Sequence, residues 1–245
     1  GNTWVRFIVA RLLLQRPLKN SGEVDKVAKD IHKLPPNYQA PKLGRVILKT
    51  HWHCSPSMRM YAQTMNAIYI IRNPVDVLAS NLDYMGVPME LRPKLIDEFI
   101  ELGGFSRWGI NRKGSGTWVE NVGSWVLDQH PFPILTLSYE QLLSNPSDNI
   151  ARIADHLGIL LSESVANQIA NETSFLNLKA MEVYERKVNL SSRESLFVNE
   201  SNIKDKSRQF MHSGRNSGSQ DIMSAMQKKR FQHSFGPFLK IIGYK

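Results

Sequence analysis

Arg72 follows an apolar run at residues 67–71 and stands directly before a predicted helix start. Asn73 is a favoured N-cap and Pro74 a favoured first helical residue, so the pattern predicts a buried strand, a turn and a helix. The free N–H groups of a helix N-terminus bind anions, and the planar fork of an arginine fits phosphate oxygens. We therefore expect a phosphate site at Arg72.

Ser80 lies about two helical turns beyond this turn, roughly 9–10 Å along the helix axis. An arginine side chain that folds back over the helix spans this distance, so Arg72 and Ser80 can bind one phosphate together. The alternative is a surface arginine and a helix serine without a joint role. The motif alone favours neither interpretation.

A second pair of candidate site residues, Lys49 and His51, lies at the end of residues 45–51, and the pattern of this segment predicts a strand. Lys49 and His51 share one face of that strand and fall at its carboxyl end, where open α/β sheets bind ligands. A neutral imidazole near pH 7 is a suitable general base, and an ammonium group can offset charge on a leaving group. The alternative is a strand-end histidine that only forms a hydrogen bond.

The same segment has the spacing of a metal pair, because His51 and His53 face the same way on a strand and Cys54 follows. Zinc would need a further ligand, and no other cluster of His, Cys or Asp at ligand spacing accompanies them. We therefore predict no metal site.

The chain opens with a glycine and two small hydrogen-bonding residues, Gly1, Asn2 and Thr3, followed by Trp4. A helical pattern follows at once, and it ends at Pro17. This arrangement predicts a second phosphate-binding loop at a helix N-terminus. The apolar face of the helix consists of Val5, Ile8, Val9, Leu12 and Leu13, with Arg6, Arg11 and Arg16 off that face.

Further elements must position these residues. Residues 133–140 predict another buried strand. The expected helices cover residues 24–34, 92–101, 117–126, 148–157, 162–171 and 230–244, and an irregular segment that covers the site is expected over residues 180–208.

A glycine-rich loop with large aromatic residues lies between two of these helices, at residues 103–116. Its rings, Phe105 and Trp108, could lie over a bound acceptor, or they could pack inward beneath a plain surface connection. Both interpretations remain open. Trp118 and Trp125 follow on one helical stripe and are expected in the core.

The composition fits one α/β domain: the chain has 245 residues, 42% of them hydrophobic, and no low-complexity linker. A net charge of +9 suits a polyanionic ligand, although the basic residues are scattered apart from the run at residues 228–230. The one cysteine excludes an internal disulfide and fits a reducing compartment, so we expect a cytoplasmic protein. No apolar run reaches the roughly 18–20 residues of a membrane span.

The order and spacing of these motifs resemble the sulfotransferase family, which takes its sulfuryl group from the donor PAPS. In that family a Pro-Lys-Ser-Gly-x-Thr-Trp loop binds the 5′-phosphosulfate, a Lys-Thr-His strand carries the base, and an Arg-Asn-Pro…Ser segment takes the 3′-phosphate. The resemblance implies an α/β fold of the P-loop nucleotide-binding type, with a central parallel sheet flanked by helices in a single domain over residues 1–245. It also places a strand and a lysine before Gly1, so we expect a leading segment that this chain lacks.

The resemblance implies a role for each site residue. His51 would take the acceptor proton, and Lys49 would offset charge on the departing phosphate oxygen of the donor. The product would be PAP. The implied donor-binding residues are Gly1, Asn2, Thr3 and Trp4 in the first loop, Arg72 and Ser80 at the 3′-phosphate, and Tyr139, Thr173 and Phe175 with Trp4 at the adenine.

A late segment completes the implied donor site. Backbone N–H groups in the turn around Gly214 can hold the 3′-phosphate from its other side. The family pattern there is Arg-Lys-Gly, but this sequence has His212 and Ser213 at the two basic positions. Arg215 could replace the lost charge.

The Trp-Val-Glu-Asn-Val-x-Ser-Trp segment at residues 118–125 and the Arg-Asn-Pro helix look most like bacterial sulfotransferases that modify natural products, including glycopeptides. We therefore expect transfer to a hydroxyl group of a small molecule, phenols included, and no nucleic-acid partner. Two rival hypotheses are a P-loop kinase, which would need a Gly-Lys-Ser/Thr loop and an acidic metal ligand, and a non-catalytic protein that binds nucleotides or nucleic acid.

Overall fold

The structure is a computed structural model, and it describes residues 1–41, 43–105, 114–188, 190–191, 194–197 and 222–244. The chain forms two compact units. The first unit comprises Gly1–Thr50 and Gln141–Gly214, and the second comprises His51–Glu140 and Arg215–Lys245. A single domain over residues 1–245 stays a prediction.

The first unit combines helices with short parallel strands. Its elements are α1 (Asn2–Leu14), α2 (Gly22–Val27), β1 (Ala28–Asp30), η1 (Ile31–Lys33), β2 (Ile47–Lys49), α7 (Pro146–His156), α8 (Glu163–Glu172) and α9 (Phe175–Lys187), and α6 (Tyr139–Ser144) enters it from the second unit. Strands β1 and β2 pair in parallel, with Ala28 opposite Ile47 and Asp30 opposite Lys49. The predicted strand at residues 45–51 is therefore present, in a shorter form.

Helix α1 is the centre of the first unit's core. It begins after Gly1, which is its N-cap, and it ends at Gln15, whose φ of 52° is left-handed. Trp4 packs against a buried cluster that combines α1, α2 and α9 with a residue further along the chain. The cluster consists of Phe7, Ala10, Val24, Leu178 and Phe197.

Two arginines of α1 are buried, although the sequence pattern placed them off the apolar face. Arg6 is 7% exposed and donates to the backbone oxygen of Ala28 at 3.1 Å and to Asp25. Arg11 is 5% exposed and forms an ion pair with Glu172 at 2.5 Å. Other parts of the chain pack around α1 on more than one face, and each buried charge therefore needs a partner.

The helix expected over residues 24–34 is wrong beyond Val27. Residues 28–30 form β1 instead, and Asp30 then caps the short η1 helix by accepting the N–H of His32 at 3.1 Å. Pairing with β2 decides this outcome, because a ladder with a distant segment overrides a weak local helix preference. Helix α9 likewise occupies residues 180–187 of the segment expected to be irregular, whereas residues 198–208 lie outside the described residues.

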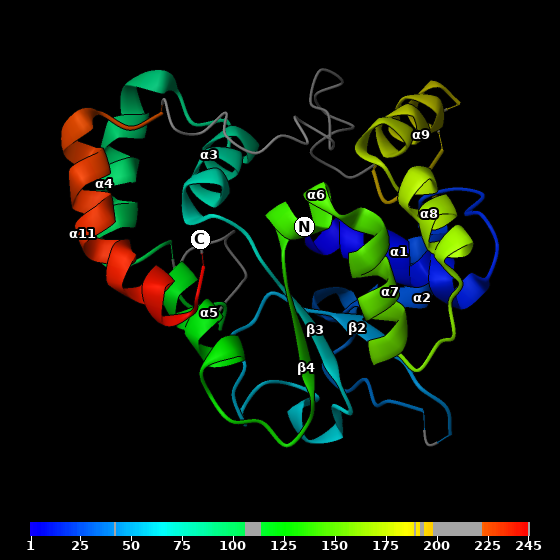
Figure 1. Cartoon of the computed structure of the whole chain (residues 1–245). Coiled ribbons are helices and arrows are strands. Elements are labelled where there is room, and N and C mark those ends of the chain that lie inside the picture. The colour runs from blue at the N-terminus through cyan, green and yellow to red at the C-terminus, as the bar shows by residue number, and fades with distance from the viewer. Residues whose placement is uncertain (42, 106–113, 189, 192–193, 198–221, 245) are drawn as a thin grey trace. The chain divides into compact units, whose positions relative to one another are not determined.

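The second unit contains a longer pair of parallel strands with helices around it. Its elements are η2 (Tyr61–Gln63), β3 (Ala67–Ile71), α3 (Pro74–Tyr84), η3 (Met89–Leu91), α4 (Arg92–Leu102), α5 (Trp118–Val126), β4 (Ile134–Ser138) and α11 (Ala225–Ile241). Figure 1 shows β3 and β4 side by side, and their register runs from Ala67 opposite Ile134 to Ile71 opposite Ser138. Within the described parts of both units, no helix is long and apolar enough to cross a membrane.

Helices α4 and α11 pack side by side (Figure 1) over an aromatic core. Phe235 of α11 is fully buried and stacks on Phe99 of α4, with ring centroids 5.5 Å apart. Phe105 also packs into this core, 5.1 Å from Phe99, so this aromatic residue of the glycine-rich loop packs inward. Trp108 lies outside the described residues. Trp118 and Trp125 pack against core clusters, as predicted.

Removing the Phe235 ring should destabilise the protein strongly. Phe235→Ala leaves a cavity against Phe99 and Phe231, and we expect the free energy of unfolding to fall by about 3–5 kcal/mol. Met226→Ala is the matched control on the same helix, because Met226 is 74% exposed, and it should change the free energy by less than about 0.5 kcal/mol. Urea unfolding of both variants measures the difference, and equal effects would contradict the packing described for α11.

Candidate functional site

Arg72 and Tyr139, two of the predicted site residues, lie together in the second unit. Ile71 and Ser138 are opposite each other at the ends of β3 and β4, so the next residue of each strand falls at the same edge. The Arg72 guanidinium carbon lies 4.5 Å from the centroid of the Tyr139 ring. This cation–π contact holds the arginine at the carboxyl end of the parallel strands, where ligands bind in open α/β folds.

The turn after Arg72 has the predicted helix start. The Asn73 side chain accepts the N–H of Val75 at 2.9 Å, and Pro74 is the first residue of α3. A second cap comes from Glu140, whose Oε1 atom accepts the N–H of Asn73 at 3.0 Å. Glu140 was not predicted as part of the site. Its position directly after Tyr139, at the carboxyl end of a predicted strand, could have indicated it. It fixes the turn on which Arg72 depends.

Tyr244 anchors Glu140 from the end of the chain. Its hydroxyl donates to the Oε2 atom of Glu140. Burial raises the pKa of Tyr244, and the hydrogen bond and negative charge of Glu140 raise it further. Burial also raises the pKa of Tyr139, although Arg72 acts in the opposite direction. Both phenols therefore stay protonated at neutral pH, and Tyr244 remains a donor.

Ser80 is exposed on α3, the helix that begins at this turn. The opposite face of α3 buries Leu78 and Leu82 in the core of the second unit. Ser80 is thus available to a ligand from solvent. Its joint role with Arg72 stays a prediction.

His51 is half-buried in the second unit, and Lys49 belongs to the first unit. The expectation that the two share one face of a strand therefore stays a prediction. Among the described residues, no group of three or more His, Cys, Asp or Glu side chains could hold a metal ion. Cys54, three residues after His51, is buried, and burial together with Asp128 raises the pKa of its thiol to about 11.

Lys49 forms a largely buried ion pair with Asp30, at 2.8 Å between Nζ and Oδ2. The side chains are 10% and 13% exposed, and the parallel register of β1 and β2 places them opposite each other. Burial raises the pKa of Asp30, but the charge and hydrogen bond of Lys49 and the N–H of His32 outweigh it, so the pKa lies below its ordinary value. Asp30 therefore holds Lys49 at the carboxyl end of β2 and was not found from the sequence.

The chain's opening residues lie near the same end of β2. The Asn2 side chain donates to the backbone oxygen of Thr50, with Nδ2 and O 3.5 Å apart. The Oδ1 atom of Asn2 is buried, and no described residue forms a hydrogen bond with it. The first turn of α1 has no acidic side chain, so no carboxylate of its own competes for its N–H groups. Gly1 is exposed, and Thr3 and Trp4 are half-buried.

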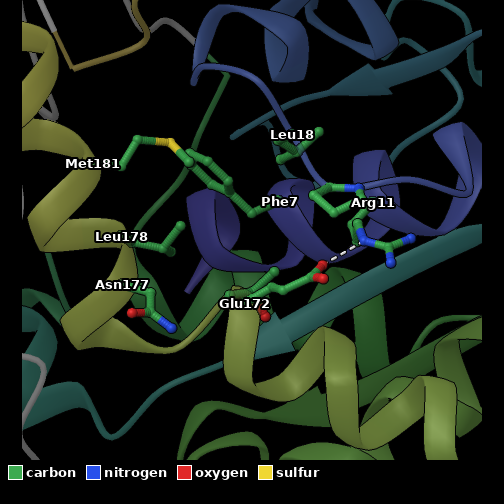
Figure 2. A pocket seen from close by; sticks show the side chains of 9 residues that line it. Phe7, Arg11, Leu18, Glu172, Asn177, Leu178 and Met181 are labelled. Atoms are coloured by element: carbon green, nitrogen blue, oxygen red, sulfur yellow. Dashed lines mark hydrogen bonds and ion pairs between the residues drawn. The ribbon is translucent and has the colours of Figure 1, made fainter.

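A cavity of about 240 Å³ lies beside α1 in the first unit (Figure 2). Thr173 lines it, but its hydroxyl already donates to the backbone oxygen of Ile169 at 2.8 Å. The ion pair of Arg11 and Glu172 forms part of its wall (Figure 2). The complete lining is Phe7, Arg11, Pro17, Leu18, Glu172, Thr173, Asn177, Leu178 and Met181.

Phe175 begins α9, two residues after Thr173. Its ring is half-buried, and the Lys179 ammonium lies 5.8 Å from the ring centroid. Thr173 is the C-cap of α8 and Phe175 begins α9, so both lie at the junction of these two helices. Their role at an adenine stays a prediction. Gly214 and Arg215 lie outside the described residues.

The comparisons with known proteins agree with the motifs. A family model described as a sulfotransferase domain matches residues 11–240. The chain belongs to the sulfotransferase family.

Relatives in mammals are similar over part of their length. Sulfotransferase 1A1 of Rattus norvegicus is 31% identical over 142 residues, which cover 57% of this chain and 46% of the relative. Sulfotransferase 1B1 of Canis lupus familiaris is 28% identical over 197 residues, which cover 73% of this chain and 62% of the relative. The matched regions thus span about half to three-fifths of these two relatives.

Solved structures confirm the predicted α/β sulfotransferase fold. Mouse sulfotransferase SULT7A1 complexed with PAP matches 95% of this chain and 79% of its own, with a TM-score of 0.58 and 17% identity. Retinol dehydratase in complex with androsterone and the inactive cofactor PAP matches 86% of this chain and 56% of its own, with a TM-score of 0.52 and 20% identity.

The pair of Asp30 and Lys49 should make stability depend on pH in the acid range. The folded-state pKa of Asp30 is lowered, so its stabilisation is present above the unfolded pKa of about 4 and is lost as the pH falls through the folded value. At pH 7, Asp30→Asn should lower the free energy of unfolding by about 2–3 kcal/mol, because it leaves Lys49 largely buried without its carboxylate. The difference from the unmutated protein should shrink towards pH 3.

Urea unfolding between pH 3 and pH 7 measures this difference. Asp83→Asn is the control, because Asp83 is 52% exposed in its ion pair with Arg92 and should cost less than about 1 kcal/mol. A loss for Asp30→Asn that is the same at every pH would contradict the assigned ion pair.

Proposed function

We propose that the protein transfers a sulfuryl group from PAPS to a hydroxyl group of a small molecule, with His51 as the general base. The observation that carries the proposal is the placement of Arg72 against Tyr139, beside the capped start of α3, in a member of the sulfotransferase family. Both structural neighbours described above hold PAP.

We assign the two phosphate-bearing ends of the donor to separate groups of residues. At the 3′-phosphate, Arg72 supplies a permanent charge and a planar set of donors, and we assign Ser80, Gly214 and Arg215 to the same group. For the 5′ end we assign Gly1, Asn2 and Thr3. The first turn of α1 carries no acidic side chain, so the N–H groups at its start suit an anion.

The adenine is assigned to aromatic and small side chains. Trp4 and Phe175 are half-buried, and we assign their rings to the adenine. Tyr139 is largely buried and lies under the Arg72 guanidinium, and we assign it to the same group. Thr173 completes this group. The assignment rests on the motifs of the family, and the raised pKa of Tyr139 supports a neutral ring at this position.

When bound, PAPS supplies an activated sulfuryl group and a phosphate leaving group. The imidazole of His51 would take the proton of the acceptor hydroxyl while the hydroxyl oxygen attacks the sulfur atom of the donor. The new oxygen–sulfur bond would form as the bond between that sulfur and the donor's phosphate oxygen breaks. Lys49, held by Asp30, offsets the negative charge on the departing phosphate oxygen.

The acceptor is proposed to be a small phenol or alcohol, as in bacterial sulfotransferases of natural products. Trp52 follows His51, and its Cδ1 atom would lie 3.3 Å from a Cβ atom added at Gly114, so the indole packs closely on the glycine-rich loop. The N–H of His53 also donates to the backbone oxygen of Gly114 at 2.9 Å. These contacts hold Gly114, at one end of that loop, close to the residues that follow His51, and they support an acceptor site there. A cytoplasmic location is proposed with this function, from the single cysteine of the sequence.

Turnover tests the chemistry. The full-length protein should transfer labelled sulfuryl from PAPS to a member of a panel of phenols, alcohols and sugars. His51→Ala should lose turnover by about a hundredfold or more and keep its affinity for PAP, since it removes the base and no donor contact. Unchanged turnover in this variant would remove His51 from its role.

Binding tests the donor site. PAP should raise the melting temperature without magnesium, and Arg72→Ala should lose much of this shift because the 3′-phosphate loses its charged partner. The same substitution should matter little for a 3′-dephosphorylated analogue, and an equal loss for both ligands would contradict the assignment. Stabilisation only by ATP with magnesium would support a kinase, and a response only to oligonucleotides would support a binding protein.

A further inference from the structure

One face of helix α5 holds the backbone that carries His51. Asn121, Ser124 and Trp125 lie three and four residues apart, so their side chains share that face. The Nδ2 atom of Asn121 donates to the backbone oxygen of His51 at 3.1 Å, and the Nε1 atom of Trp125 donates to that of Trp52 at 3.0 Å. The hydroxyl of Ser124 accepts the N–H of Cys54 at 2.9 Å.

Asn121 uses its whole amide in this arrangement. Its Nδ2 atom also donates to the backbone oxygen of Ser115 at 2.7 Å, and its Oδ1 atom accepts the hydroxyl of Tyr69 at 2.8 Å. Two carbonyl partners require N–H donors, so the orientation of the amide is determined by its surroundings. One side chain thus joins the His51 segment, the end of the glycine-rich loop and strand β3.

The far end of this hydrogen-bond network lies in a strand ladder and a stacked ring pair. Tyr69 pairs with Thr136 in the ladder of β3 and β4, and its ring stacks on Trp125 with centroids 5.4 Å apart and planes at 12°. Burial raises the pKa of Tyr69, so its hydroxyl stays a donor to Asn121. Helix α5 itself begins with a capping box of Thr117 and Glu120. The hydrogen bonds that hold residues 51–54 therefore come from side chains on a helix, and one of these side chains is in turn held by a strand.

We propose that Asn121 is a positioning residue for His51, and that it sets the place from which the imidazole takes the acceptor proton. The inference rests on the proposed function, since it deepens the role given to His51. With the backbone held at residues 51, 52 and 54, the position of the imidazole depends mainly on the two side-chain torsions of His51. A base displaced by about 1 Å can lose a factor on the order of 100 in rate, so a fixed backbone has a direct catalytic value.

The test compares turnover with donor binding in the full-length protein. In Asn121→Ala, kcat should fall about 10- to 100-fold while the Kd for PAP and the KM for PAPS stay within about twofold, because the hydrogen-bond partners of the Asn121 side chain are His51, Ser115 and Tyr69, and none of them is assigned to the donor. Tyr69→Phe, which keeps the ring and loses only the bond to Asn121, should lower kcat about three- to tenfold, and it preserves the test if Asn121→Ala does not fold.

Ser124→Ala is the matched control on the same face of α5. It releases Cys54 rather than His51, and kcat should change by less than about threefold. A loss in Ser124→Ala as large as in Asn121→Ala would overturn the proposal, because the helix as a whole would then be responsible. A folded Asn121→Ala variant with unchanged kcat, or with a loss of PAP affinity equal to its loss of kcat, would overturn it as well.

His51→Ala separates this inference from the proposed function. If His51→Ala loses turnover and folded Asn121→Ala keeps it, the positioning role alone fails. If His51→Ala keeps turnover, the role of His51 fails and the positioning role fails with it. The pH profile of kcat supplies a further readout: Asn121→Ala should lower its plateau and leave its acid limb in place, since the base is moved and not replaced.

Discussion

Parallel pairing of β3 with β4 is the constraint on which the second unit depends. The register that sets Ile71 opposite Ser138 brings the next residue of each strand to one edge, where Arg72 lies over the ring of Tyr139. The same edge holds the start of α3, capped by Asn73 and by Glu140. A shift of this register by one residue would turn the side chains of one strand to the other face and separate these groups.

The first unit shows how a basic chain accommodates charge in its interior. Arg6, Arg11 and Lys49 are largely buried, and each has a carboxylate partner. Such pairs stabilise a fold less than apolar packing does, but the removal of one partner is costly. Their effect here is to fix geometry: Asp30 holds Lys49 at the end of β2, and Glu172 holds Arg11 at the wall of the cavity.

Backbone contacts connect the core of the second unit with the proposed base. The Tyr69 ring lies against Trp125, and its hydroxyl reaches Asn121, so packing in the core also orients the amide that holds His51. The capping box of α5 fixes where the helix begins and therefore which of its side chains face residues 51–54. Structure and proposed chemistry thus share the same few side chains.

The sequence by itself determined the local elements: the turn from β3 to α3, the helix after Gly1 and the strands before Arg72 and Tyr139 all follow from short-range patterns. It also indicated the family, because the motif residues are contiguous. Only the tertiary structure decided that residues 28–30 form a strand, that Arg6, Arg11 and Phe105 are buried, and that Asp30, Glu140 and Asn121 hold the site residues. The reason is physical: each of these outcomes depends on a partner distant in the chain, and neither periodicity nor local propensity carries information about such partners.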